Sequence, residues 1–216
     1  MLTSTIRKEF LYRVILDHSL EFILMEVCFM LQSALKFTHA LLYQSVEDGD
    51  IVIDATVGNG NDTLLLADIV GPEGTVIGFD IQRDAISATQ NRLNEADLNQ
   101  RVQLIEAGHE LVDSFSIKDS SIAAAVYNLG YLPKGDKSII TSPDTTIESL
   151  SKVLPLLKPG GLILIMVYYG HEGGAEEKEA VLSFAQSLPQ KSYDVLQYAF
   201  INQKNSPPFL LAIEKK

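Results

Sequence analysis

Short apolar runs alternate along this chain with longer segments in which apolar residues recur every three or four positions. The runs predict buried strands and the periodic segments predict helices. Strands that alternate with helices form a parallel sheet, whereas two final strands joined by a loop form a hairpin. The fold class is therefore predicted to be α/β, with a seven-stranded, mostly parallel sheet, one antiparallel strand and helices on both faces. The expected strands cover residues 51–54, 75–79, 102–105, 121–128, 162–168, 194–201 and 209–214, and the expected helices 31–46, 62–70, 84–96, 145–157 and 175–188.

The length of the chain suits one well-packed domain and is short for two, since it has 216 residues of which 46% are hydrophobic. The domain pattern begins at about Met30, so we expect a domain over residues 30–216 and an N-terminal extension over 1–29. The extension is either a mis-assigned start or an amphipathic helix that packs on the domain or on a partner. Glu21 and Glu26 interrupt its apolar stretch, which argues against a membrane span and a secretory signal.

Composition limits the cellular compartments and the classes of partner that are expected for this protein. A single cysteine, Cys28, excludes an internal disulfide framework and indicates a reducing compartment, for which the cytoplasm is the default. The four histidines show no metal-ligand spacing, so no metal is expected. The formal charge of −11 argues against nucleic-acid binding through bulk electrostatics and leaves room for a small basic patch. Candidates for that patch are Lys134, Lys137, Lys191 and Lys204.

A glycine turn follows the first predicted strand. The strand ends at Asp54 and leads into Gly58-Asn-Gly60, after which a helix begins. Glycines are expected there because the backbone must bend sharply and lie against a ligand where a Cβ would clash. The second strand ends at Asp80, twenty residues beyond Gly60, where a carboxylate can accept hydrogen bonds from both hydroxyls of a ribose.

The details of this turn separate two classes of nucleoside cofactor. A dinucleotide site would place a third glycine where this chain has Thr63, and its diphosphate would meet the acidic Asp62. The ammonium and sulfonium of S-adenosylmethionine suit an acidic turn better, so we expect that cofactor rather than NAD. The residues expected to bind it are Asp54, Thr56, Gly58, Asn59, Gly60, Asn61, Asp62, Thr63, Asp80, Gln82, His109 and Asn128.

Residues for an acceptor substrate follow the fourth and fifth strands. Asn128-Leu-Gly-Tyr131 has the amide-to-aromatic spacing of the Asn-Pro-Pro-Tyr element of amino-directed methyltransferases, without its prolines. The alternative is a loop asparagine with a tyrosine at the edge of the core. His171 is a candidate proton acceptor because its ordinary pKa lies near neutrality, and Tyr169 could stack on a base. We expect Asn128, Tyr131 and His171 to be catalytic.

A second group of residues is expected to contact the substrate without taking part in the chemistry. The last strand runs antiparallel, so the loop before it should emerge on the ligand side and form a substrate rim. The substrate-binding candidates are Tyr131, Lys134, Lys137, Tyr169, His171 and Asn205.

Four segments together resemble the MnmM (YtqB-like) family of class I methyltransferases: Asp54–Thr63, Asn128–Lys137, Tyr169–Gly174 and Asn205–Pro208. The resemblance covers about Met30 to Lys216 and is most specific in the second segment. It implies a Rossmann-like class I methyltransferase that uses S-adenosylmethionine. It also implies methylation of the aminomethyl group of 5-aminomethyl-2-thiouridine at the tRNA wobble position, with the tRNA anticodon stem-loop as partner and a homodimer as assembly.

Other functions stay open on the residues alone. A methyltransferase of a small-molecule amine or of rRNA would use the same turn. A non-catalytic RNA-binding or assembly module would keep the fold, although the intact Asp54, Gly58, Gly60 and Asp80 argue against it. An NAD oxidoreductase is disfavoured by the acidic turn.

Overall fold

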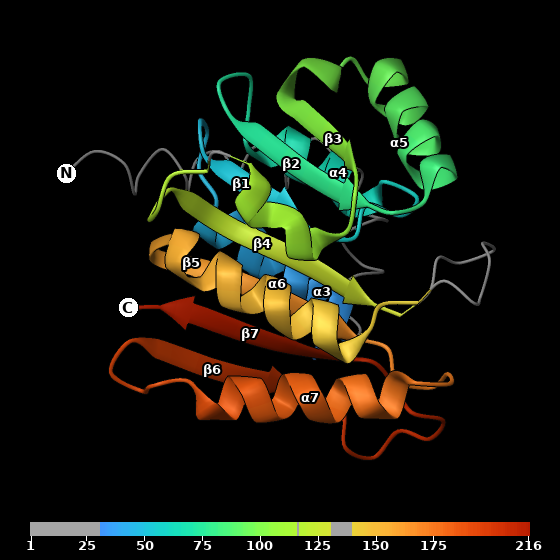
Figure 1. Ribbon diagram of the computed structural model, residues 1–216, viewed down its shortest axis with the longest axis vertical. Helices are drawn as coiled ribbons and strands as arrows, with labels where there is room; N and C mark the ends of the chain where they lie inside the picture. The colour runs from blue at the N-terminus through green and yellow to red at the C-terminus, as the bar shows by residue number, and fades with distance from the viewer. Residues whose placement is uncertain (1–30, 116, 131–139) are drawn as a thin grey trace, which may run out of the picture. The chain divides into compact units, whose positions relative to one another are not determined.

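The computed structural model describes residues 31–115, 117–130 and 140–216 of the chain (Figure 1). Within this part, seven strands form one sheet in the order β3-β2-β1-β4-β5-β7-β6. The first five strands pair in parallel, and β7 is antiparallel to both β5 and β6. The predicted sheet is confirmed. Its strands are β1 (Ile51–Asp54), β2 (Thr75–Asp80), β3 (Val102–Glu106), β4 (Ile122–Leu129), β5 (Leu157–Val167), β6 (Tyr193–Tyr198) and β7 (Phe209–Lys215).

Helices cover both faces of the sheet. One buried cluster joins the sheet to α6, α7 and η2, and a second joins the other face to α3, α4 and α5. Figure 1 accordingly shows α6 in front of the strands and α3 behind them. The helices are α3 (Ala34–Ser45), α4 (Asn61–Ile69), α5 (Arg83–Glu95), α6 (Pro143–Leu156) and α7 (Gly174–Ser187), with two short 3₁₀ helices, η1 (Asn99–Arg101) and η2 (His109–Ser114).

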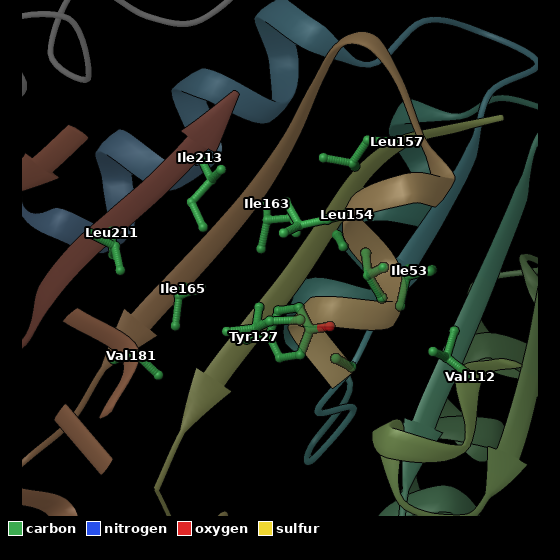
Figure 2. Close-up of a cluster of buried hydrophobic side chains, with 14 of the residues drawn as sticks. Ile53, Val112, Tyr127, Leu154, Leu157, Ile163, Ile165, Val181, Leu211 and Ile213 are labelled. Carbon is green, nitrogen blue, oxygen red and sulfur yellow. The ribbon is translucent and has the colours of Figure 1, made fainter. Parts of the chain in front are cut away.

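The central strands are apolar along their whole length because both faces are covered. Six of the eight residues of β4 are buried in succession, from Ile122 to Tyr127. Figure 2 shows Tyr127 in the same cluster as Leu154 of α6 and Ile163 of β5. The Tyr127 hydroxyl lies 2.9 Å from Ser149 Oγ, which satisfies a polar group inside this apolar layer.

Three predicted boundaries are wrong. We expected Lys158–Gly161 to separate α6 from the fifth strand, but β5 begins at Leu157 and includes these residues. The pairing of β4 with β5 shifts register between Ile122 and Ala124, and a Cβ on Gly161 would lie 2.9 Å from Ile122 O, so this glycine allows the irregular pairing. The sixth strand ends at Tyr198 rather than at residue 201. Helix α3 begins at Ala34 rather than at residue 31.

The parallel strands place their carboxyl ends at one edge of the sheet. Asp54 at the end of β1 pairs with Gly78 of β2 and with Val126 of β4. Loops that follow these strands therefore meet beyond one edge, where ligands bind in open α/β sheets. Among the described helices, none is both long and apolar enough to span a membrane.

Candidate active site

A cavity of about 1050 Å³ lies beyond the carboxyl ends of the parallel strands. The loops after β1 to β5 line it, together with α3 and the loop before β7. Most of the predicted site residues lie on its wall: Thr56, Gly58, Asn59, Asn61, Asp62, Asp80, Gln82, His109, Asn128, Tyr169 and His171. Tyr131, Lys134 and Lys137 lie outside the described residues.

Four predicted residues do not line this cavity: Asp54, Gly60, Thr63 and Asn205. Asp54 and Thr63 are joined by a side-chain hydrogen bond next to the glycine turn, and Gly60 belongs to the turn itself. Gly60 has φ 76°, and a Cβ there would lie 2.6 Å from Thr89 Oγ1 of α5. This glycine is therefore required by a left-handed backbone and by close packing on α5, rather than by contact with a ligand. Asn205 is exposed, and its neighbour Ser206 lines the cavity instead.

Asp80 fixes the glycine turn from the end of β2. Its Oδ2 accepts a hydrogen bond from Gly58 N at 2.8 Å, and its Oδ1 accepts one from Gln82 N at 2.8 Å. Burial raises the pKa of Asp80, and these two backbone hydrogen bonds oppose the rise. Each carboxylate oxygen keeps a second lone pair, so the side chain can accept further hydrogen bonds from a ligand in the cavity.

Asp54 is buried below the turn, with 1% of its surface exposed. Its Oδ2 lies 2.6 Å from Thr63 Oγ1, and its Oδ1 accepts a hydrogen bond from Thr56 N at 3.1 Å. Burial and then the charge of Asp62 raise the pKa of Asp54 from 3.8 to about 7, against the two hydrogen bonds. This carboxyl group is thus a structural element of the turn whose ionisation opposes folding.

The substitution Asp54→Asn should change how stability depends on pH. Between the ordinary pKa of 3.8 and about 7, the folded wild type holds a proton that the unfolded chain releases, so its stability falls as pH rises through this range. The variant has no such proton. The difference between its free energy of unfolding and that of the wild type should therefore shift in favour of the variant as pH rises. The shift is about 1.4 kcal/mol per unit of pKa shift. Urea denaturation at about pH 5 and about pH 8 measures this, and a difference that does not vary with pH would contradict it.

Asp62 joins two elements that are distant in sequence. Its Oδ2 accepts a hydrogen bond from Asn128 Nδ2 at 2.7 Å, and its Oδ1 lies 2.9 Å from His39 Nε2 of α3. The backbone N of Asn128 donates to Thr56 Oγ1 at 2.7 Å. A carboxylate only accepts, so the NH₂ group of Asn128 must face Asp62 and the amide oxygen is left for another donor.

The segment after Asn128 is tied to α7. Gly130 N donates to Thr141 Oγ1 at 2.9 Å, and Thr141 N donates to Gly130 O at 3.0 Å. Thr141 Oγ1 and Thr146 Oγ1 each donate to Glu177 at 2.7 Å, and Glu177 is only 2% exposed. A buried carboxylate with two hydroxyl donors holds the end of β4 and the start of α6 to α7.

His109 lines the cavity, and one of its ring nitrogens is buried. The residue is 8% exposed, and its Nδ1 has no hydrogen-bond partner among the described residues. Burial lowers the pKa of His109, so the ring is neutral near pH 7. Ser149 Oγ donates to His109 O at 3.0 Å and fixes the position of the residue. Glu110 Oε2 lies 3.9 Å from Nδ1, beyond hydrogen-bond distance, so this nitrogen could still pair with a polar ligand atom.

His171 lies on the side of the cavity nearest the end of β4. Its Nδ1 is 2.8 Å from Glu172 O, and since a carbonyl oxygen only accepts, Nδ1 carries the hydrogen. In the neutral ring, Nε2 then carries the lone pair. A Cβ on Gly130 would lie 3.3 Å from this Nε2, so the imidazole reaches the segment that begins with Asn128.

Tyr169, which also lines the cavity, has a cation beside its ring. Lys178 Nζ lies 5.1 Å from the centre of the Tyr169 ring.

Comparisons with known proteins agree with this geometry. The model of a family described as "Putative rRNA methylase" matches residues 76–214. A model of protein-L-isoaspartate(D-aspartate) O-methyltransferases matches residues 1–115, which include the glycine turn and Asp80. A relative from Arabidopsis thaliana, the chloroplastic tRNA (mnm(5)s(2)U34)-methyltransferase, is 37% identical over 86% of this chain and 70% of its own length. The chain belongs to this rRNA methylase family.

Two solved structures support the assignment. A protein from Clostridium thermocellum described as a "putative rRNA-methylase" has a TM-score of 0.84 and 47% identity, with 87% of this chain and 100% of that chain covered. A "putative methyltransferase" from Streptococcus mutans in complex with SAH has a TM-score of 0.79 and 40% identity, over 87% and 100% of the two chains. The resemblance to the MnmM group and the class I methyltransferase fold are confirmed.

As a member of the rRNA methylase family, the chain is a methyltransferase that depends on S-adenosylmethionine. The residues that line the cavity also suit this cofactor, independently of the comparisons. The Asp80 carboxylate offers two acceptors to ribose hydroxyls, His109 Nδ1 lacks a partner within the described residues, and Asp62 supplies negative charge for a cation. Asp80 and His109 suit the nucleoside, and Asp62 suits the charged methionine part.

Sequence reasoning missed three residues that shape the site of this methyltransferase. His39 was interpreted only as one of four dispersed histidines, although it lies one helical turn after Leu35 and both line the cavity. Thr141 and Glu177 gave no local signal because their role depends on contacts across 36 residues. The position of His39 beside an apolar helix face could have been noticed.

Proposed function

We propose that this enzyme methylates the aminomethyl nitrogen of 5-aminomethyl-2-thiouridine at the wobble position of tRNA, to give 5-methylaminomethyl-2-thiouridine. The observation that carries the proposal is the orientation of Asn128. Its NH₂ group donates to Asp62, so its amide oxygen is the acceptor that a target N–H requires. The Arabidopsis relative, named for this modification at U34, supports the choice of substrate.

The acceptor amine must lose a proton before it reacts. An alkyl amine resembles the lysine amine, with a pKa of about 10.4, and is mostly protonated at neutral pH. When bound, S-adenosylmethionine would supply the methyl group of its sulfonium, and the neutral amine would attack this carbon in line, with S-adenosylhomocysteine as the leaving group. Asn128 orients the N–H so that the nitrogen lone pair points at the methyl group, and His171 Nε2 accepts the proton.

The RNA contact is proposed to be small. The net charge of −11 argues against a contact that depends on a broad positive surface, as in a general RNA binder. Lys178, beside the cavity-lining Tyr169, and Lys204, close to the cavity-lining Ser206, can meet phosphates near the site. Together with Lys134 and Lys137, they would form a footprint on the anticodon stem-loop, assembled across a homodimer.

Nucleoside mass spectrometry tests the proposal. Purified protein is incubated with S-adenosylmethionine and tRNA that carries 5-aminomethyl-2-thiouridine, and the digested nucleosides are analysed. We expect this nucleoside to gain one methyl group. The same tRNA with an unmodified wobble uridine should gain none, because it has no primary amine.

Two parallel substrates make the result decisive. Ribosomal RNA and a small primary amine are incubated under the same conditions, and cofactor binding is measured by calorimetry. If the protein binds S-adenosylmethionine but methylates either alternative and not the tRNA, the proposed substrate is wrong.

A further inference from the structure

His39 lies on α3, outside every segment that the sequence linked to catalysis, yet it lines the cavity. Its Nε2 is 2.9 Å from Asp62 Oδ1, and the His39 side chain is 33% exposed. Asp62 uses its other oxygen to accept the hydrogen bond from Asn128 Nδ2 at 2.7 Å. Three side chains from α3, α4 and β4 are thereby connected in a row.

Asp62 is largely buried and lies close to two other ionisable side chains, Asp54 and Tyr168. Its side chain is only 13% exposed. The Asp62 charge helps to raise the pKa of the buried Asp54 and, after burial, that of Tyr168. The Asp62 carboxylate has a hydrogen-bond partner on each of its oxygens, which together hold it in one orientation. His39 supplies the donor on one side, as Asn128 does on the other.

We propose that His39 is a positioning residue for methyl transfer: it holds Asp62 in place, and Asp62 in turn sets the amide orientation of Asn128. This inference rests on the proposed function, in which the Asn128 oxygen accepts the target N–H. Without His39, Asp62 can rotate, and the Asn128 amide is then able to turn its NH₂ group toward the substrate amine. The NH₂ group would then donate to the nitrogen lone pair and turn it away from the methyl group.

The kinetic test uses the full chain with His39→Ala and His39→Gln on tRNA that carries 5-aminomethyl-2-thiouridine. At saturating S-adenosylmethionine, we expect His39→Ala to lower kcat by about tenfold to 100-fold, with the KM for tRNA changed less than about threefold. His39→Gln should recover most of the rate because its terminal amide can donate to Asp62 Oδ1 from a similar position. Tyr43→Ala is the matched control, since Tyr43 lies on the same helix, is 57% exposed and does not line the cavity.

A double-mutant cycle separates this role from a general structural one. If His39 acts through Asn128, then His39→Ala should cost almost nothing in single-turnover rate when Asn128→Ala is already present. An equal loss in both backgrounds would overturn the proposal. A higher KM for tRNA with an unchanged kcat would also overturn it, because His39 would then be a contact to RNA.

A measurement without substrate distinguishes failure of this inference from failure of the proposed function. The side-chain NH₂ signals of Asn128 in ¹⁵N-labelled protein report its hydrogen bond to Asp62. We expect faster hydrogen exchange of these signals in His39→Ala and unchanged exchange in His39→Gln. If the wild type fails to methylate the tRNA, the proposed substrate is wrong, and the exchange rates alone then decide whether His39 positions Asn128. Equal exchange in the wild type and His39→Ala would refute the positioning role.

Discussion

Replacing Asn128 by alanine is expected to lower kcat by about 100-fold or more while the Kd for S-adenosylmethionine stays within about threefold. The side chain supplies the amide oxygen proposed to orient the acceptor nitrogen, and alanine offers no acceptor in its place. The backbone hydrogen bond from Asn128 N to Thr56 Oγ1 does not depend on the side chain, so the end of β4 should stay in position. Single-turnover kinetics on the modified tRNA, with calorimetric titration of the cofactor, measure both quantities.

Asn94→Ala provides the matched control for this variant. Asn94 belongs to α5 and is exposed, and its amide oxygen accepts a hydrogen bond from Gln90 Nε2 at 3.3 Å, away from the cavity wall. It should leave both kcat and Kd unchanged. An equal loss of cofactor affinity in Asn128→Ala would show that Asn128 serves the cofactor rather than the acceptor, and our division of roles would then be wrong.

The sheet could be predicted from the sequence because its strands are buried on both faces. The run Ile122–Tyr127 is apolar at every position, and such a pattern leaves little choice of structure. The boundaries that failed are those at which a local signal competes with tertiary packing. Pro159 and the glycines after it normally end an element, but pairing with β4 extends β5 back to Leu157.

Site residues could be predicted from the sequence only where they lie at or just after the ends of predicted strands. Asp80 is the last residue of β2 and Asn128 the last but one of β4, so the strand order places both at the cavity whatever the conformation of the loops. The partners of these residues could not be predicted in this way. The contact between His39 and Asp62 joins two helices, and Glu177 meets Thr141 across the end of β4. Such contacts depend on how helices pack on the sheet, which periodicity does not specify.

Replacing Asp80 is expected to have the largest effect on cofactor binding. Asp80→Ala removes the two acceptors that hold Gly58 N and Gln82 N, and also the acceptors proposed for the ribose hydroxyls. Hydrogen bonds to a charged group contribute about 1.5–3 kcal/mol each, so the loss of two should weaken binding by about 100-fold or more. Calorimetric titration with S-adenosylmethionine measures this loss, and thermal unfolding shows whether the fold survives.

Asp80→Asn distinguishes the ribose contact from support of the turn. An asparagine can still accept at one oxygen, but its NH₂ group would oppose one of the two backbone N–H groups and would offer the ribose a donor. We therefore expect intermediate affinity, with a melting temperature closer to that of the wild type than Asp80→Ala shows. If Asp80→Asn binds the cofactor as tightly as the wild type, the charge of Asp80 has no part in recognition, and the carboxylate serves only to hold the glycine turn.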